Sequence, residues 1–183
     1  MASENNLPIY WGPDYVLDSG VETRTKSGPL AKILIGGEVP GVDLIAPLPI
    51  TRDELLEIHD EHYIDRLVNF ERPELTRSIF ASTGGVRDAL DAMFEHGKAG
   101  SLSSGLHHAK RDHDEGLCYI NGLALAALRA ISKHGVKKLL YLIPIRTVVA
   151  EHFNSSAKMK KYCLQMSVAT LTTLGNRIQN DTI

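Results

Sequence analysis

The stretch that decides the fold is residues 103–121, which read Ser103-Ser104-Gly105-Leu106-His107-His108-Ala109, a charged run from Lys110 to Glu115, and Gly116-Leu117-Cys118-Tyr119-Ile120-Asn121. The apolar run from Gly100 to Leu106 predicts a buried strand that ends just before the two histidines. Imidazoles at the carboxyl end of a strand can stand in a cleft and titrate near neutral pH. We therefore place the chemistry of this chain in residues 103–121.

Strands and helices are predicted to alternate on both sides of this stretch. A helix over residues 78–96 precedes the strand, and its Gly84-Gly85 pair indicates either a break or close backbone packing. Asn121 begins the clearest helix of the chain, Gly135 ends it, and residues 136–142 predict a further strand. Strand, helix and strand form a βαβ unit. The sequence therefore predicts an α/β fold, a three-layer parallel sheet with helices on both faces.

The amino-terminal part of the chain adds shorter elements. Strands are predicted over residues 7–11 and 42–45. Residues 29–35 fit a helix or a strand, because periodicity does not decide between them. Thr51 with Glu54 predicts a capping box at the start of a helix that runs to His59, and Asp60 can cap a second helix.

Composition and charge exclude several classes of protein. The chain has 183 residues, of which 43% are hydrophobic and 23% charged, which fits a soluble domain with its own core. A net charge of -2 and a pI of about 6.4 give no basic field for nucleic acid or an anionic membrane. The apolar runs are too short to span a bilayer. Two cysteines without CxxC spacing imply neither a disulfide framework nor a thiolate zinc site, so a reducing, cytoplasmic compartment is expected.

Residues 104–110 and 116–121 together resemble the zinc-dependent histone deacetylase family. Upstream segments agree in order: residues 58–64 resemble the family's H-x-x-x-Y-I helix segment, and Ser82-Thr83-Gly84-Gly85 resembles its S-T-G-G element. Residues 21–26 stand where a substrate-rim loop would be. The resemblance covers about residues 7–142, so residues 1–142 are interpreted as the amino-terminal portion of a deacetylase-like domain.

This resemblance implies an arginase/deacetylase-like fold and hydrolysis of N-acetyl-lysine or another acetylated amine, such as an acetylated polyamine. His107 would hydrogen-bond the metal-bound water, and His108 would act as general base and then as general acid. Gly116 and Leu117 would line the acyl-lysine channel, although the family usually has an aromatic residue where Leu117 stands. The implied cofactor is zinc, which lowers the pKa of its bound water and polarises the amide carbonyl.

The family's zinc ligands are where this chain departs from the pattern. The first two lie in a D-x-D-x-H segment directly after the strand that corresponds to residues 138–142. This chain instead has Ile143-Pro144-Ile145-Arg146-Thr147 there, so no residue is assigned as a metal ligand. We therefore expect that the chain does not bind zinc.

A shift of reading frame would explain the missing segment. If each codon from Leu142 onward is read from its third base, the shifted codons permit Asp-Ser-Asp-x-His-Cys-Gly-Gly-Gly-Thr, in register with the preceding strand. A one-base loss near codon 142 or 143 would place residues 143–183 out of frame. We then expect a truncated and inactive deacetylase domain, poorly stable because its sheet loses later strands.

Other interpretations of the same residues stay open. Adjacent histidines are more often surface or capping residues than catalytic ones, and the flanking motif is what favours catalysis here. A non-catalytic fragment that binds acyl-lysine or another protein is the alternative from a different class. Arginase-like chemistry is disfavoured, because the aspartate-rich motifs that hold its metals are absent. The residues leave the oligomeric state open.

Further expectations concern the exposure of the other residues near the motif. His59 and His62, beside Asp60 and Glu61, could suggest a metal cluster, but on an amphipathic helix they are expected to form an exposed face. His113 and Asp114 are expected to be solvated. Cys118 is expected to be a small buried hydrophobic residue.

Overall fold

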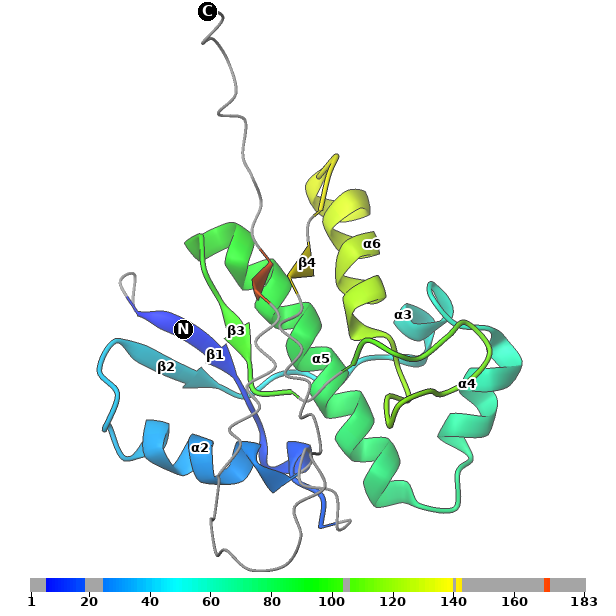
Figure 1. Ribbon diagram of the computed structural model, residues 1–183, viewed down its shortest axis with the longest axis horizontal. Coiled ribbons are helices and arrows are strands. Elements are labelled where there is room, and N and C mark those ends of the chain that lie inside the picture. The colour runs from blue at the N-terminus through cyan, green and yellow to red at the C-terminus, as the bar shows by residue number, and fades with distance from the viewer. Residues whose placement is uncertain (1–5, 19–24, 104–105, 140, 143–169, 172–183) are drawn as a thin grey trace, which may run out of the picture.

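A three-stranded parallel sheet forms one side of the structure, which is a computed structural model (Figure 1). The described residues are 6–18, 25–103, 106–139, 141–142 and 170–171. The central strand β1 (Leu7–Tyr10) pairs in parallel with β2 (Val42–Ile45) and with β3 (Gly100–Ser101). Leu7 lies opposite Val42, and Ile9 lies opposite Gly100. The strands predicted over residues 7–11 and 42–45 are confirmed.

The strand β3 ends earlier than the apolar run predicted, at Ser101 instead of Leu106. The backbone N–H of Leu102 still donates to the Tyr10 carbonyl at 3.0 Å, but the N–H of Ser103 bonds to the Ser101 hydroxyl at 3.3 Å. Leu106 then has a φ of 42°, which no strand accommodates. A side chain that binds the backbone locally competes with the sheet ladder, and here the chain leaves the sheet.

The helices follow the predicted order, with one short 3₁₀ helix that was not predicted. They are the short 3₁₀ helix η1 (Pro13–Tyr15), α2 (Ser27–Ile35), α3 (Arg52–Leu56), α4 (Glu61–Val68), α5 (Pro73–His96) and α6 (Gly122–His134). The capping box at Thr51 and Glu54 is present, and Gly97 and Gly135 end α5 and α6 in the left-handed conformation. The ambiguous residues 29–35 are helical. α3 is shorter than predicted and α5 starts earlier, with Pro73 in its first turn.

The long helix α5 runs through the middle of the molecule and contacts β1, β3, η1 and α6 (Figure 1). Gly84-Gly85 does not break it. A Cβ at Gly84 would overlap the Leu48 carbonyl, and one at Gly85 would overlap the Tyr15 hydroxyl. The second of the two expectations for this pair, close backbone packing, is therefore correct. It brings the 47–50 segment and η1 against the helix.

The strand predicted over residues 136–142 forms at its last two residues, as β4 (Tyr141–Leu142). It pairs antiparallel with β5 (Thr170–Leu171). Within the described part of the chain, β4 does not join the parallel sheet, so the predicted βαβ pairing with β3 is wrong there. Because β3 leaves the sheet after Ser101, it presents a very short edge for a further parallel strand.

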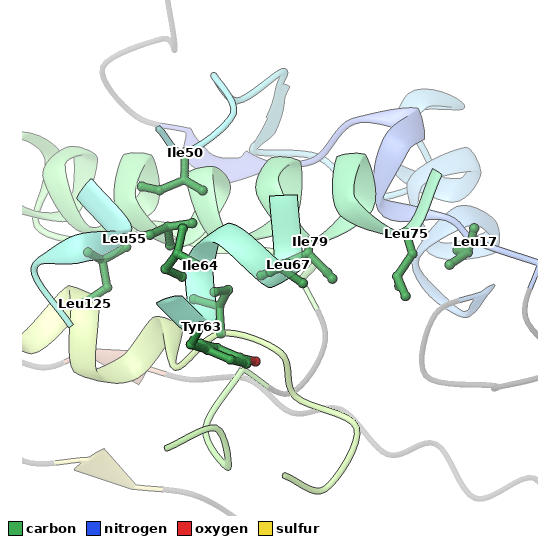
Figure 2. Close-up of a cluster of buried hydrophobic side chains, with 10 residues drawn as sticks. Leu17, Ile50, Leu55, Tyr63, Ile64, Leu67, Leu75, Ile79 and Leu125 are labelled. Carbon is green, nitrogen blue, oxygen red and sulfur yellow. The ribbon is translucent and has the colours of Figure 1, made fainter. Parts of the chain in front are cut away.

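The main hydrophobic core lies where α3, α4, α5 and α6 meet (Figure 2). Leu55, Ile64, Ile79 and Leu125 contribute from these four helices, and all are at most 4% exposed. Ile120, which is fully buried, joins the same core from the end of the His-His segment. Among the described residues, no helix is both long enough and apolar enough to cross a membrane. The arrangement confirms the predicted α/β class.

Candidate functional site

His107 and His108 stand in the connection between β3 and α6. Their ring centroids are 4.0 Å apart, with the ring planes inclined by 42°. His107 is half-buried and His108 is exposed. The residues on either side, Leu106 and Ala109, are buried and anchor the pair to the protein. The two imidazoles are therefore adjacent, and one of them faces solvent.

Gly116 lies directly against the second histidine. Its φ is 56°, in the left-handed region, and a Cβ built there would stand 2.7 Å from Cδ2 of His108. Both observations favour glycine at this position. The structure thus brings together Gly116, which the resemblance places in the channel, and His108, which it makes the base. Leu117 follows with a φ of 67° and a side chain that is 64% exposed.

Asn121 connects the histidine pair to α6. Its Oδ1 accepts from the backbone N–H of Ala124 at 3.0 Å, which caps the helix as predicted. Its Nδ2 donates to the carbonyls of Ala109, at 3.0 Å, and His107, at 3.4 Å. One side chain therefore sets both the start of α6 and the backbone of the His-His pair.

His59 is 1% exposed, so the expectation that it lies on an exposed helix face is wrong. It follows α3 and sits under the His-His segment, where Nε2 accepts from the backbone N–H of Asn121 at 3.2 Å. Its Nδ1 lies 3.3 Å from the Arg111 carbonyl. Burial lowers the pKa of His59, although the backbone hydrogen bond with Arg111 opposes the shift. His62 is exposed, as expected.

His59 lies in the turn between α3 and α4, so no helical spacing signalled its burial. It packs beside Tyr63, four residues later, with the ring centroids 5.4 Å apart. Tyr63 itself is 4% exposed, and its hydroxyl donates to the Tyr119 carbonyl at 2.7 Å. Burial raises the pKa of Tyr63. The H-x-x-x-Y-I segment thus points its histidine and its tyrosine at the same loop.

Exposed contacts add to the attachment of the loop. The Arg111 guanidinium donates to the Asp60 carboxylate at 2.6 Å, and the backbone N–H of Asp60 donates to the Arg111 carbonyl at 2.9 Å. Asp60 is therefore at the cap position of α4 but uses its side chain on Arg111. An exposed ion pair stabilises little by itself. Here the Asp60–Arg111 pair holds the first residues of the loop against the start of α4.

The remaining expectations for this loop are met. Cys118 is 5% exposed and behaves as a small buried residue. His113 and Asp114 are exposed. The Nδ1 of His113 lies 2.6 Å from the Asp112 carboxylate, and this hydrogen bond holds the pKa of Asp112 below its usual range.

The donor set of the described residues does not supply a catalytic zinc site. Nowhere in the described ranges do three histidine, cysteine, aspartate or glutamate side chains gather as a metal would require. A catalytic zinc ion needs three protein ligands. Residues 143–147, where the resemblance places the first ligands, lie outside the described part and contain no residue of these types.

This chain is similar to a family model, to a known protein and to a solved structure. The sequence model of the histone deacetylase domain matches residues 22–142. Histone deacetylase clr6 of Schizosaccharomyces pombe is 27% identical over 129 residues, which is 55% of this chain and 30% of that relative. The crystal structure of the HDA15 HD domain matches with a TM-score of 0.60 at 18% identity, covering 72% of this chain and 44% of that chain. This chain therefore spans less than half the length of each of these two relatives.

Proposed function

Since this chain belongs to the histone deacetylase family, we propose that residues 1–142 are the amino-terminal part of a deacetylase domain that acts on N-acetyl-lysine or another acetylated amine. The family match to residues 22–142 and the deacetylase-like fold of the described residues support this proposal. The resemblance supplies the zinc dependence of the reaction, and the present residues supply part of the site.

The observation that carries the proposal is the geometry around His108. An exposed imidazole stands 4.0 Å from that of His107, and Gly116 leaves open the face beside it that a side chain would fill. We propose that His108 takes a proton from the attacking water and returns it to the leaving amine. His107, half-buried behind it, would hydrogen-bond that water. Gly116 and the exposed Leu117 would form one wall of the acyl-lysine channel.

We also propose that the chain, as its sequence reads, is not a competent deacetylase. Its residues 143–147 offer no zinc ligand, whereas the shifted frame permits an Asp-x-Asp-x-His segment at that place. A one-base loss near codon 142 or 143 accounts for both facts. The DNA sequence across codons 142–152 tests this directly. Shifted codons that fail to encode Asp-x-Asp-x-His would contradict the proposal.

A paired assay tests the activity. The 183-residue chain and the product of the frame-restored gene are purified, and zinc content and turnover of an acetyl-lysine peptide are measured for both. We expect zinc and turnover in the restored product and neither in the present chain. Replacement of His108 by Ala in the restored product should abolish turnover without removing zinc. Stoichiometric zinc with turnover in the 183-residue chain would overturn the proposal that this chain is inactive.

The exposed Leu117 beside Gly116 favours a second candidate, a non-catalytic fragment that binds acyl-lysine. On this alternative, the metal-free chain binds an acetylated peptide more tightly than the same peptide without the acetyl group. Replacement of Leu117 by Asp should weaken that binding, whereas the same change at the exposed Leu48, whose backbone packs against Gly84 of α5, should not. Equal binding of both peptides would remove this candidate.

A further inference from the structure

We infer that His59 is a positioning residue for the His107–His108 pair, which it holds in place through Asn121 and Arg111 as a neutral imidazole protonated at Nδ1. The inference rests on the proposed function in one respect, that the pair is the working part of the site. The contacts that carry it are independent of any activity.

Both ring nitrogens of His59 are in use. The backbone N–H of Asn121 can only donate, so Nε2, at 3.2 Å, must accept and carries no proton. The Arg111 carbonyl can only accept, so Nδ1, at 3.3 Å, must donate. These two partners together select one neutral tautomer. At 1% exposure, the ring has no room to exchange them for water.

The two partners lie on either side of residues 112–120, the loop that follows the histidine pair. Asn121 reaches back to the pair itself, because its side chain donates to the His107 and Ala109 carbonyls while its backbone is held by His59. On the other side, Arg111 shares its carbonyl between His59 and the backbone N–H of Asp60. His59 therefore fixes the loop at its entry and at its exit.

The loop needs such support because its backbone is strained on both sides of the pair. Leu106 and Leu117 have φ values of 42° and 67°, which are unfavourable for residues with a Cβ. Such conformations persist where the surrounding structure over-determines them. A leucine of similar size would fill the space of His59 but would leave the Asn121 N–H and the Arg111 carbonyl without their buried partner.

Histidine NMR on the full chain tests the inference without any activity measurement. Three variants are compared with the parent chain: His59→Leu, which removes both hydrogen bonds; His59→Gln, which keeps an acceptor and a donor; and Leu55→Ala, which destabilises the neighbouring core. The tautomer of His59 and the ring signals of His107 and His108 are recorded at one fixed pH. The exchange of the Ala124 amide, which reports the Asn121 cap, is followed in parallel.

We expect the Nδ1–H tautomer in the parent chain. His59→Leu should move the ring signals of His107 and His108 and speed exchange of the Ala124 amide about tenfold. His59→Gln should restore much of both, and Leu55→Ala should leave the ring signals in place. An Nε2–H tautomer in the parent chain overturns the inference even if His59→Leu does not fold. So do unchanged ring signals in a folded His59→Leu variant. Absence of deacetylase activity in every sample would concern the proposed function alone.

Discussion

At the scale of single residues, Gly116 is the position where the site depends on having no side chain. Its φ of 56° and the short approach to His108 both act against any other residue. We predict that Gly116→Ala destabilises the chain by about 1–2 kcal/mol and displaces the His108 ring. Thermal unfolding and the His108 NMR signal measure the two effects.

Gly135 provides a matched control for this prediction. It also has a positive φ, 68°, but a Cβ there would meet nothing within 4 Å. Gly135→Ala should therefore lose stability through backbone conformation alone and leave the His108 signal in place. Identical His108 signals in the two variants would show that the contact with Gly116 does not position the ring.

The buried His59 predicts a pH dependence of stability. Burial lowers its pKa below the ordinary value near 6.5, so the unfolded chain takes up the proton first as the pH falls. The stability from neutral His59 is complete above about pH 6.5 and declines below it, at up to about 1.4 kcal/mol per pH unit, until the folded pKa is reached. The nearby charges of Asp60 and Arg111 act in opposite directions.

Urea unfolding at a series of pH values checks this dependence. The parent chain should lose stability between pH 6.5 and 5 by more than His59→Gln does. His62→Gln, a change at the exposed neighbour, should keep the parent's slope. Equal slopes for the parent and His59→Gln would mean that His59 does not titrate on unfolding in this range.

At the scale of secondary-structure elements, the Gly84-Gly85 pair decides how closely α5 approaches its neighbours. Alanine is favoured over glycine inside a helix by about 1 kcal/mol, so Gly84→Ala should be stabilising on propensity alone. A Cβ at Gly84 would overlap the Leu48 carbonyl, which is backbone and cannot rotate away. We therefore predict a net loss of about 1–3 kcal/mol on thermal unfolding.

Gly28 in α2 is the comparison for that change. An alanine Cβ there would stand 3.2 Å from a methyl group of Val16, a side chain that is 38% exposed and can move. Gly28→Ala should be close to neutral. If both substitutions stabilise the chain to the same degree, the packing of α5 is looser than its contacts imply.

Asp91 joins α5 to α6, the helix that carries Asn121 at its start. It accepts from Arg129 at 2.7 and 2.9 Å, from Lys133 at 2.8 Å, and contacts His134 at 3.0 Å. Partial burial would raise the pKa of Asp91, but these hydrogen bonds outweigh it and hold the pKa below the ordinary value of 3.8. The contribution is therefore present above about pH 3.8 and is lost as the pH falls below it.

We predict that Asp91→Asn lowers the free energy of unfolding at pH 7 by about 1–3 kcal/mol. Glu95→Gln, on the same helix with a side chain 74% exposed, should change it by less than about 0.5 kcal/mol. Denaturant unfolding of both variants gives the comparison. If Glu95→Gln lowers the free energy of unfolding as much as Asp91→Asn does, the effect comes from the charge on the helix and not from the α5–α6 contact.

At the scale of the whole molecule, the question is what residues 143–183 contribute. If they are out of frame, a chain that stops after Leu142 should unfold within a few degrees of the 183-residue chain. The frame-restored product should unfold at a temperature higher by at least about 5 °C, because further strands would extend the sheet. The antiparallel pair β4–β5 is a contact that this truncation would remove, so a structural role of the tail would appear as a loss of stability. A clear loss of stability on stopping at Leu142 would show that the tail is part of the fold.

Much of the architecture follows from interactions between residues close in sequence. The capping box at Thr51, the Asn121 cap and the left-handed glycines at 97 and 135 each act within a few residues, so the ends of these helices were predictable. The His-His motif with its Gly116 partner could also be recognised as a local sequence pattern. The structure places these residues together, with Gly116 against His108.

Other features depend on residues far apart in the chain, and local patterns could not settle them. The length of β3 is set by its pairing with β1, about ninety positions earlier in the chain, which covers only Gly100 and Ser101. His59 looks like an exposed polar residue until Asn121, sixty-two positions later, provides the hydrogen bond that lets it be buried. Burial of a polar ring is stable only where partners meet it, and those partners exist only once the chain has folded.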